Sequence, residues 1–132
     1  MQNLEQLQNN APIIKKTNEL YREFYQYLKL FPKQDQYMLG KRCEEYILNF
    51  IELVLLCVGL EKNKKLEVLK QADSKFDVLK FLLMATQELK MLDNKKYLSL
   101  EKRMQEIGRM LGGWIRSLQE KRPDIHRDAF AI

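Results

Sequence analysis

Hydrophobic residues recur every three or four positions along most of this chain, which is the spacing of one side of an α-helix. Alternation with period two, the signature of a half-buried strand, does not extend over any useful length of the sequence. The pattern predicts helices at about residues 12–31, 33–58, 63–92 and 95–121, followed by a polar tail at 122–132. Long helices with short connections pack as antiparallel neighbours, so we expect a single all-α domain, an up-down-up-down four-helix bundle.

Residues typical of helix ends stand at the boundaries of these segments. Pro12 suits the first position of a helix, and Phe31 precedes a proline and therefore avoids the helical region. Gly59 is a natural stop after the second helix, and the pair Asp93-Asn94 favours a turn before the fourth.

Each predicted helix carries one apolar stripe that we expect to face the core. The stripes are Ile13, Leu20, Phe24, Tyr27/Leu28 and Phe31; Leu39, Cys43, Tyr46/Ile47, Phe50/Ile51, Val54 and Cys57/Val58; Leu69, Ala72, Phe76, Leu79, Leu83 and Thr86; and Leu100, Ile107, Leu111, Trp114 and Leu118. A core of this size fits one domain of 132 residues.

Apolar residues outside these stripes exceed what a small bundle needs. The third helix carries five of them, and the second is apolar nearly all round at residues 53–58. Those of the third helix are Val78, Phe81, Leu82, Ala85 and Leu89. Because each helix of a small bundle buries about one face, the surplus predicts a homo-oligomer. The alternative is a wide core stripe with an imprecise helical phase.

The segment EIGRMLGGWIRSL at residues 106–118 keeps Gly108, Gly112 and Gly113 inside a predicted helix. Each interior glycine costs a helix roughly 1 kcal/mol relative to alanine. Gly108 and Gly112 fall on the flank between the core stripe and the opposite side, so they predict a neighbour too close for a Cβ. That neighbour is either another helix of the same bundle or a second subunit.

The chain has a formal net charge of +5, and all of the excess lies in its second half. Residues 1–60 carry seven basic and seven acidic side chains, whereas residues 61–132 carry 16 basic and 11 acidic ones. The candidates for binding RNA or DNA are Lys62, Lys64 and Lys65, then Lys95 and Lys96, and the rail Lys102, Arg109 and Arg116. Lysine and arginine bind phosphate backbones with salt-sensitive affinity and little sequence preference. The alternative for each cluster is an ordinary solvated helix face.

Residues that would carry catalysis or hold a cofactor or metal are not grouped in the sequence. Cys43 and Cys57 lie 14 positions apart on one helix, roughly 21 Å, and are interpreted as small buried hydrophobes. His126, the only histidine, sits in the polar tail, and the adjacent Glu44-Glu45 point in different directions. We therefore expect neither an enzyme nor a metal or cofactor site.

The N-terminal segment MQNLEQLQNNAP lacks a basic start followed by an apolar run, so a secretory signal is not predicted. The longest apolar stretch, residues 46–60, includes Asn49 and Glu52 and is too short to span a membrane. These features predict a cytoplasmic protein with no membrane partner.

Three segments together resemble a known family: FPKQDQYMLGKRCEEYILNFIELV, KKLEVLKQADSKFDVLKFLLMATQEL and EIGRMLGGWIRSL. They are similar to the accessory variability determinant (Avd) family of diversity-generating retroelements, which is related to four-helix proteins encoded in ribosomal RNA intervening sequences. The resemblance covers about residues 20–118.

The resemblance implies a four-helix protomer that assembles into a pentameric ring with a basic surface. It also implies a non-catalytic accessory role, with a reverse transcriptase and its template RNA or cDNA as partners in mutagenic cDNA synthesis. The alternative within the same resemblance is a protein of the intervening-sequence type, a structural or protein-interaction module that binds no nucleic acid.

Overall fold

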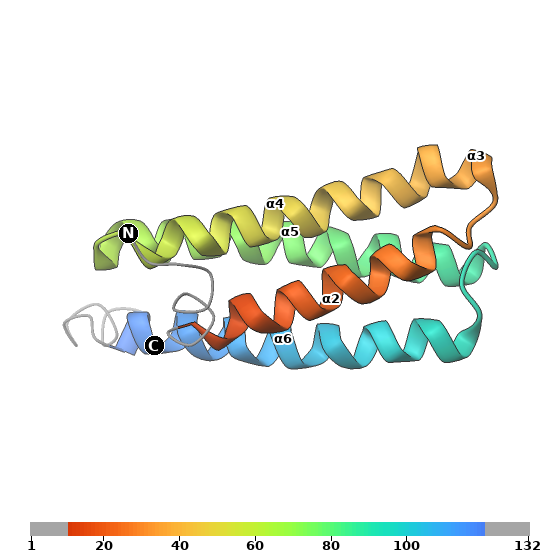
Figure 1. Cartoon of the computed structure of the whole chain (residues 1–132). Coiled ribbons are helices and arrows are strands. Elements are labelled where there is room, and N and C mark those ends of the chain that lie inside the picture. The colour runs from red at the N-terminus through yellow and green to blue at the C-terminus, as the bar shows by residue number, and fades with distance from the viewer. Residues whose placement is uncertain (1–10, 121–132) are drawn as a thin grey trace, which may run out of the picture.

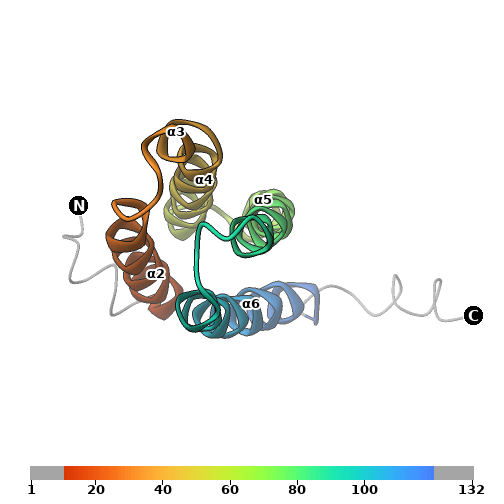
Figure 2. The same ribbon diagram turned by 90° about the vertical axis from the view of Figure 1, so that its right-hand side faces the viewer.

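A computed structural model describes residues 11–120, which form four long helices and no strand. They are α2 (Pro12–Leu28), α4 (Lys41–Val58), α5 (Lys62–Glu88) and α6 (Asn94–Glu120), and they run alternately up and down (Figure 1). Seen from the end, α2 and α5 each lie between α4 and α6, which face one another across the core (Figure 2). The predicted four-helix architecture is confirmed. The predicted tail at 122–132, with Pro123 and His126, lies outside the described residues.

The core is built from the predicted stripes. On α5 every residue of the predicted stripe is buried, and the Thr86 hydroxyl satisfies its hydrogen-bonding capacity by donating to the carbonyl of Leu83 at 2.6 Å. Phe50 of α4 packs against Phe76 of α5 with ring centroids 5.1 Å apart. On α6 Leu100, Ile107, Leu111 and Leu118 are buried, and Met104 joins them.

Both cysteines behave as small hydrophobes of this core. Cys43 and Cys57 are buried and unbridged on α4. Burial raises the pKa of the Cys43 thiol to about 12 and that of Cys57 to about 11. Neither group forms a thiolate near neutral pH, which agrees with the structural role predicted for them.

The junction between the first two predicted helices differs from the expected one. Helix α2 ends at Leu28 rather than at residue 31, because the chain turns there and buries Phe31 edge-on against Phe24, with ring centroids 6.1 Å apart. The predicted helix at 33–58 is interrupted: a short α3 (Lys33–Asp35) and a π-helical turn η1 (Gln36–Gly40) precede α4.

Gly40 accounts for this interruption. A Cβ at Gly40 would overlap the side chain of Leu28 and lie 3.0 Å from the carbonyl oxygen of Asp35. Only glycine permits such close packing where η1 crosses the end of α2. The periodicity of apolar residues cannot show an insertion of this kind, because a π-turn shifts the helical phase without breaking the run.

The third helix ends at Glu88 instead of residue 92. Lys90 adopts a left-handed conformation with φ of 62°, its N–H donates to Gln87, and the N–H of Met91 donates to the carbonyl of Thr86 at 2.8 Å. This pair of hydrogen bonds is a Schellman motif. The sequence prediction missed it because the left-handed position holds lysine where glycine is usual.

Candidate functional site

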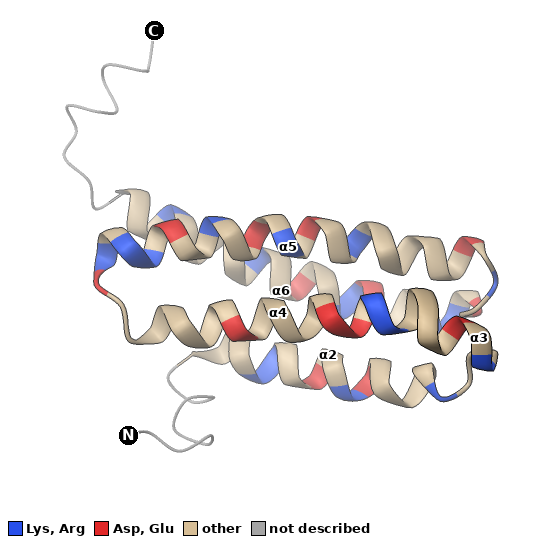
Figure 3. Cartoon of the chain, turned by 90° about the horizontal axis from the view of Figure 1, so that it is seen from above, with Lys and Arg blue, Asp and Glu red and all other residues tan. Residues whose placement is uncertain are grey.

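The predicted basic rail exists on α6. Lys102, Arg109 and Arg116 are exposed, and none of them forms an ion pair with an acidic side chain of residues 11–119. Elsewhere on the four helices basic and acidic residues are interspersed (Figure 3). The rail is therefore a set of unneutralised cations rather than one face of a uniformly basic surface.

The lysines at the start of α5 are not equivalent. Lys64 is exposed, whereas Lys62 and Lys65 are half-buried. Lys65 lines a cavity of about 560 Å³ at the end of the bundle, together with Val58 and Trp114. Trp114 was predicted in the core, but it is only half-buried, because little of the described chain covers α6 at this end.

The lysines at the start of α6 differ in the same way. Lys95 is exposed, but the ammonium of Lys96 lies 2.9 Å from the Asp93 carboxylate, and the Lys96 backbone N–H donates to the same side chain at 2.8 Å. Asp93 thus caps α6. The hydrogen bonds from Lys96 lower the pKa of Asp93. The starts of α5 and α6 lie at opposite ends of the bundle, so these lysines form two separate patches (Figure 1).

One flank of α6 is closed by polar contacts with α2. Arg103 binds Glu23 and also reaches Glu19 at 3.2 Å. Glu23 accepts further hydrogen bonds from Tyr27 and from Ser99. We call these five residues and the neighbouring ion pair of Lys16 with Glu106, at 3.2 Å, the closed flank.

The carboxylate of Glu23 is the centre of the closed flank. Burial alone raises its pKa, but the hydrogen bonds from Ser99, Tyr27 and Arg103 outweigh this effect and hold the pKa below its ordinary value. Arg103 is not among the residues predicted from the sequence. The available signal was the pair Glu19 and Glu23, four residues apart on the α2 side facing α6.

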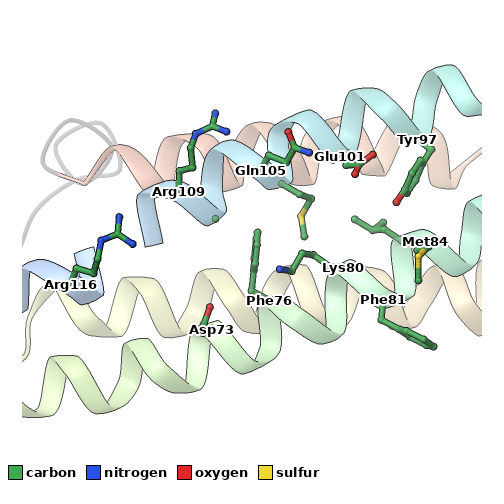
Figure 4. A pocket seen from close by; sticks show the side chains of 13 residues that line it. Asp73, Phe76, Lys80, Phe81, Met84, Tyr97, Glu101, Gln105, Arg109 and Arg116 are labelled. Carbon is green, nitrogen blue, oxygen red and sulfur yellow. The ribbon is translucent and has the colours of Figure 1, made fainter. Parts of the chain in front are cut away.

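The opposite flank of α6 faces α5 across an open groove of about 840 Å³ (Figure 4). The side chains of Phe76, Lys80 and Tyr97 point into the space between the two helices, and Arg109 and Arg116 lie at one end of it. Asp73, Phe81, Leu83, Met84, Glu101, Met104, Gln105 and Gly108 complete the lining. We call this surface the α5/α6 groove.

Gly108 faces Phe76 of α5 without crowding, whereas Gly112 has no other described helix beside it. A Cβ at Gly108 would lie 3.4 Å from the ring of Phe76, an ordinary contact, and one at Gly112 would meet only the guanidinium of Arg116, at 3.3 Å. Neither distance requires glycine within the described residues, and a second subunit as the close neighbour stays a prediction. Gly108 lines the α5/α6 groove, and Gly112, four residues later, lies on the same side of α6.

The predicted surplus of apolar surface is partly confirmed. Phe81 is 63% exposed and Leu89 is 64% exposed, as expected for residues outside the core. Leu82 is half-buried and packs against the core, because it lies nearer to the buried stripe of α5. Helix α4 adds Leu48, Leu55 and Leu56, which are 43%, 37% and 54% exposed.

Within residues 11–120 no group of three or more histidine, cysteine or acidic side chains is arranged to hold a metal ion. Glu44 and Glu45 diverge: Glu44 accepts a hydrogen bond from the Tyr21 hydroxyl, and Glu45 pairs with Arg42. None of the helices between residues 11 and 120 is long and apolar enough to cross a membrane.

Comparison with known proteins agrees with the resemblance carried by the sequence. The family model described as bAvd-like matches residues 12–118, which include all four long helices almost completely. Among curated proteins, none matches the chain. Since the family match covers most of the sequence and the fold is the expected four-helix one, the chain belongs to the bAvd-like family.

Proposed function

We propose that this protein is a non-catalytic accessory protein of a diversity-generating retroelement, which forms a homopentameric ring and binds a reverse transcriptase together with its template RNA or cDNA. Membership of the bAvd-like family supports the accessory role. The observation that carries nucleic-acid binding is the set of exposed cations without acidic partners in the described chain, above all Lys64, Lys95 and Lys102.

A ring would allow these separated cations to bind nucleic acid together. In one protomer Lys64 and Lys95 lie near opposite ends of the bundle, and each contributes a weak contact with phosphate. Repeating the same contacts around a ring turns several weak contacts into one avid one. The mechanism is therefore scaffolding: the protein holds the nucleic acid and the polymerase near each other, and the polymerase carries the chemistry.

Filter binding of a structured RNA at two salt concentrations tests this function. The double variant Lys64→Glu/Lys102→Glu is expected to bind at least about 10-fold more weakly and to lose about one unit of salt slope per phosphate contact removed. The matched control is Lys15→Glu/Arg22→Glu on α2, an exposed pair whose reversal changes the formal charge equally. Equal losses in both variants would assign binding to net charge alone.

The alternative function predicts a different result for the unmodified protein. A structural or protein-interaction module retains no RNA even at low salt. Co-purification with the reverse transcriptase of the same retroelement tests the protein partner separately. Light scattering tests the ring, and a monomer at micromolar concentration would contradict it.

A further inference from the structure

Two surfaces of the protomer combine exposed apolar side chains with charges of opposite sign. One is the α5/α6 groove, which is lined by Phe81 and Met84, 63% and 41% exposed, and has Arg109 and Arg116 at one end. The other is the outer side of α4, which does not line the groove and belongs to the helix diagonal to α6. The two surfaces therefore lie on different sides of the same bundle.

The outer side of α4 is an apolar stripe edged by carboxylates. Leu48, Ile51 and Leu55 share one side of the helix, at positions i, i+3 and i+7. Glu45 and Glu52 flank Leu48, three residues before it and four residues after it. Glu52 forms no ion pair with the described residues, and Glu45 has only its exposed contact with Arg42 at 3.1 Å.

We propose that the outer side of α4 of one protomer docks into the α5/α6 groove of a second copy, with Glu45 and Glu52 pairing with Arg109 and Arg116. The inference rests on the ring proposed above and names the surfaces that build it. Each protomer then docks its α4 into the groove of one neighbour and accepts the α4 of another neighbour in its own groove. Such a head-to-tail contact generates a ring when its rotation closes, whereas a contact between identical patches stops at a dimer.

The spacing of the charged residues supports α4 of a second copy as the occupant of the groove. Glu45 and Glu52 are seven residues apart, and so are Arg109 and Arg116, which places each pair about 10.5 Å apart along its helix. The match holds for either direction of the docked helix. Arg109 and Arg116 have no acidic partner within 4.0 Å among the side chains of residues 11–119, although Asp73 and Glu101 also line the groove.

The glycines of α6 acquire a role in this arrangement. Gly108 has no side chain on the α6 wall of the groove, and the only described atoms within 4 Å of a Cβ at Gly112 belong to the flexible Arg116 side chain. A second helix bearing Leu48 and Leu55 can approach this wall closely, as helices do at small residues. The docking also covers the leucines of α4, which are otherwise 43% and 37% exposed.

Charge exchange between the two surfaces is the test, with sedimentation velocity at micromolar protomer concentration as the measurement. Arg109→Glu/Arg116→Glu and Glu45→Arg/Glu52→Arg are each expected to raise the dissociation constant of assembly at least about 100-fold, because like charges then face each other. The quadruple variant, which restores opposite charges, is expected to reassemble. Lys15→Glu/Arg22→Glu is the matched control and keeps the unmodified mass.

The outcomes separate this inference from the proposed function. A monomeric unmodified protein would refute the ring itself. A ring that persists in Arg109→Glu/Arg116→Glu would overturn only the docking surfaces, and loss of RNA binding in that intact ring would assign the arginines to nucleic acid. Circular dichroism confirms folding of each variant, and Gly108→Gln, which adds a side chain to the groove lining without changing charge, must also weaken assembly.

Discussion

The two flanks of α6 contain similar residues but use them differently. On the closed flank, Arg103 is held by Glu19 and Glu23 of α2, so its charge is neutralised inside the protomer. On the groove side, Arg109 and Arg116 lie near two glycines and form no ion pair with the acidic side chains of residues 11–119. The number of basic residues on a helix therefore says little about function until those that pair with carboxylates of the same protomer are excluded.

Replacing Glu23 by alanine gives the largest expected effect on protomer stability. Three donors lose their acceptor on a side chain that is only 13% exposed, so we expect the free energy of unfolding to fall by about 2 kcal/mol. Arg109→Ala, on the open flank, is expected to change it by less than about 0.5 kcal/mol. Urea denaturation at one fixed protomer concentration measures both, and equal losses would erase the distinction between the flanks.

Acid should weaken the closed flank selectively. The pKa of Glu23 is lower in the folded chain than in the unfolded one, so its contribution is fully present above the unfolded pKa of about 4.3. That contribution is lost as the pH falls through the folded pKa. Glu23→Gln is therefore expected to show a shallower loss of stability below about pH 5. Parallel pH profiles for the variant and the unmodified protein would contradict this assignment.

On the open flank, Gly112→Ala is expected to stabilise the protomer by up to about 1 kcal/mol through helix propensity. Its Cβ meets only the flexible end of Arg116. Gly40→Ala is the control with the opposite expected sign. It should destabilise the protomer, because its Cβ would overlap Leu28 and approach a backbone carbonyl. Thermal unfolding of both variants measures the contrast. A destabilised Gly112→Ala protomer would show that the groove side is packed more tightly than the structure indicates.

The smallest expected difference concerns two ion pairs. Lys16 and Glu106 join α2 to α6, and their side chains are 33% and 42% exposed, so a double-mutant cycle should give a coupling energy of about 0.5 kcal/mol. Lys80 and Asp77, on α5 beside the groove, are more than half exposed, and their coupling should be nearer zero. A stronger coupling for the second pair would reverse the comparison.

Much of the fold could be predicted because apolar spacing reports directly which side of a helix is buried. The stripe of α5 from Leu69 to Thr86 was predicted without error. The misses occurred where local geometry departs from the regular helix. The π-turn before Gly40 keeps the apolar run intact, and the left-handed Lys90 lacks the glycine that usually marks a helix end.

The candidate site was less predictable because it depends on residues brought together from distant segments. The rail Lys102, Arg109 and Arg116 was found from its seven-residue repeat and is exposed as expected. Lys96 was a candidate too, but Asp93 holds its ammonium. Arg103 escaped notice, since nothing local in the sequence indicates that Glu19 and Glu23, 80 or more residues earlier, lie beside it.

The sequence by itself determined the helices, most of their buried faces and the family to which the chain belongs. Each of these follows from the spacing of apolar residues or from motifs within single segments of the chain. Only the tertiary structure decided which cations form ion pairs within the described residues and what lies beside Gly108 and Gly112 there. Both properties depend on distances between helices, and burial periodicity carries no information about what lies across a groove.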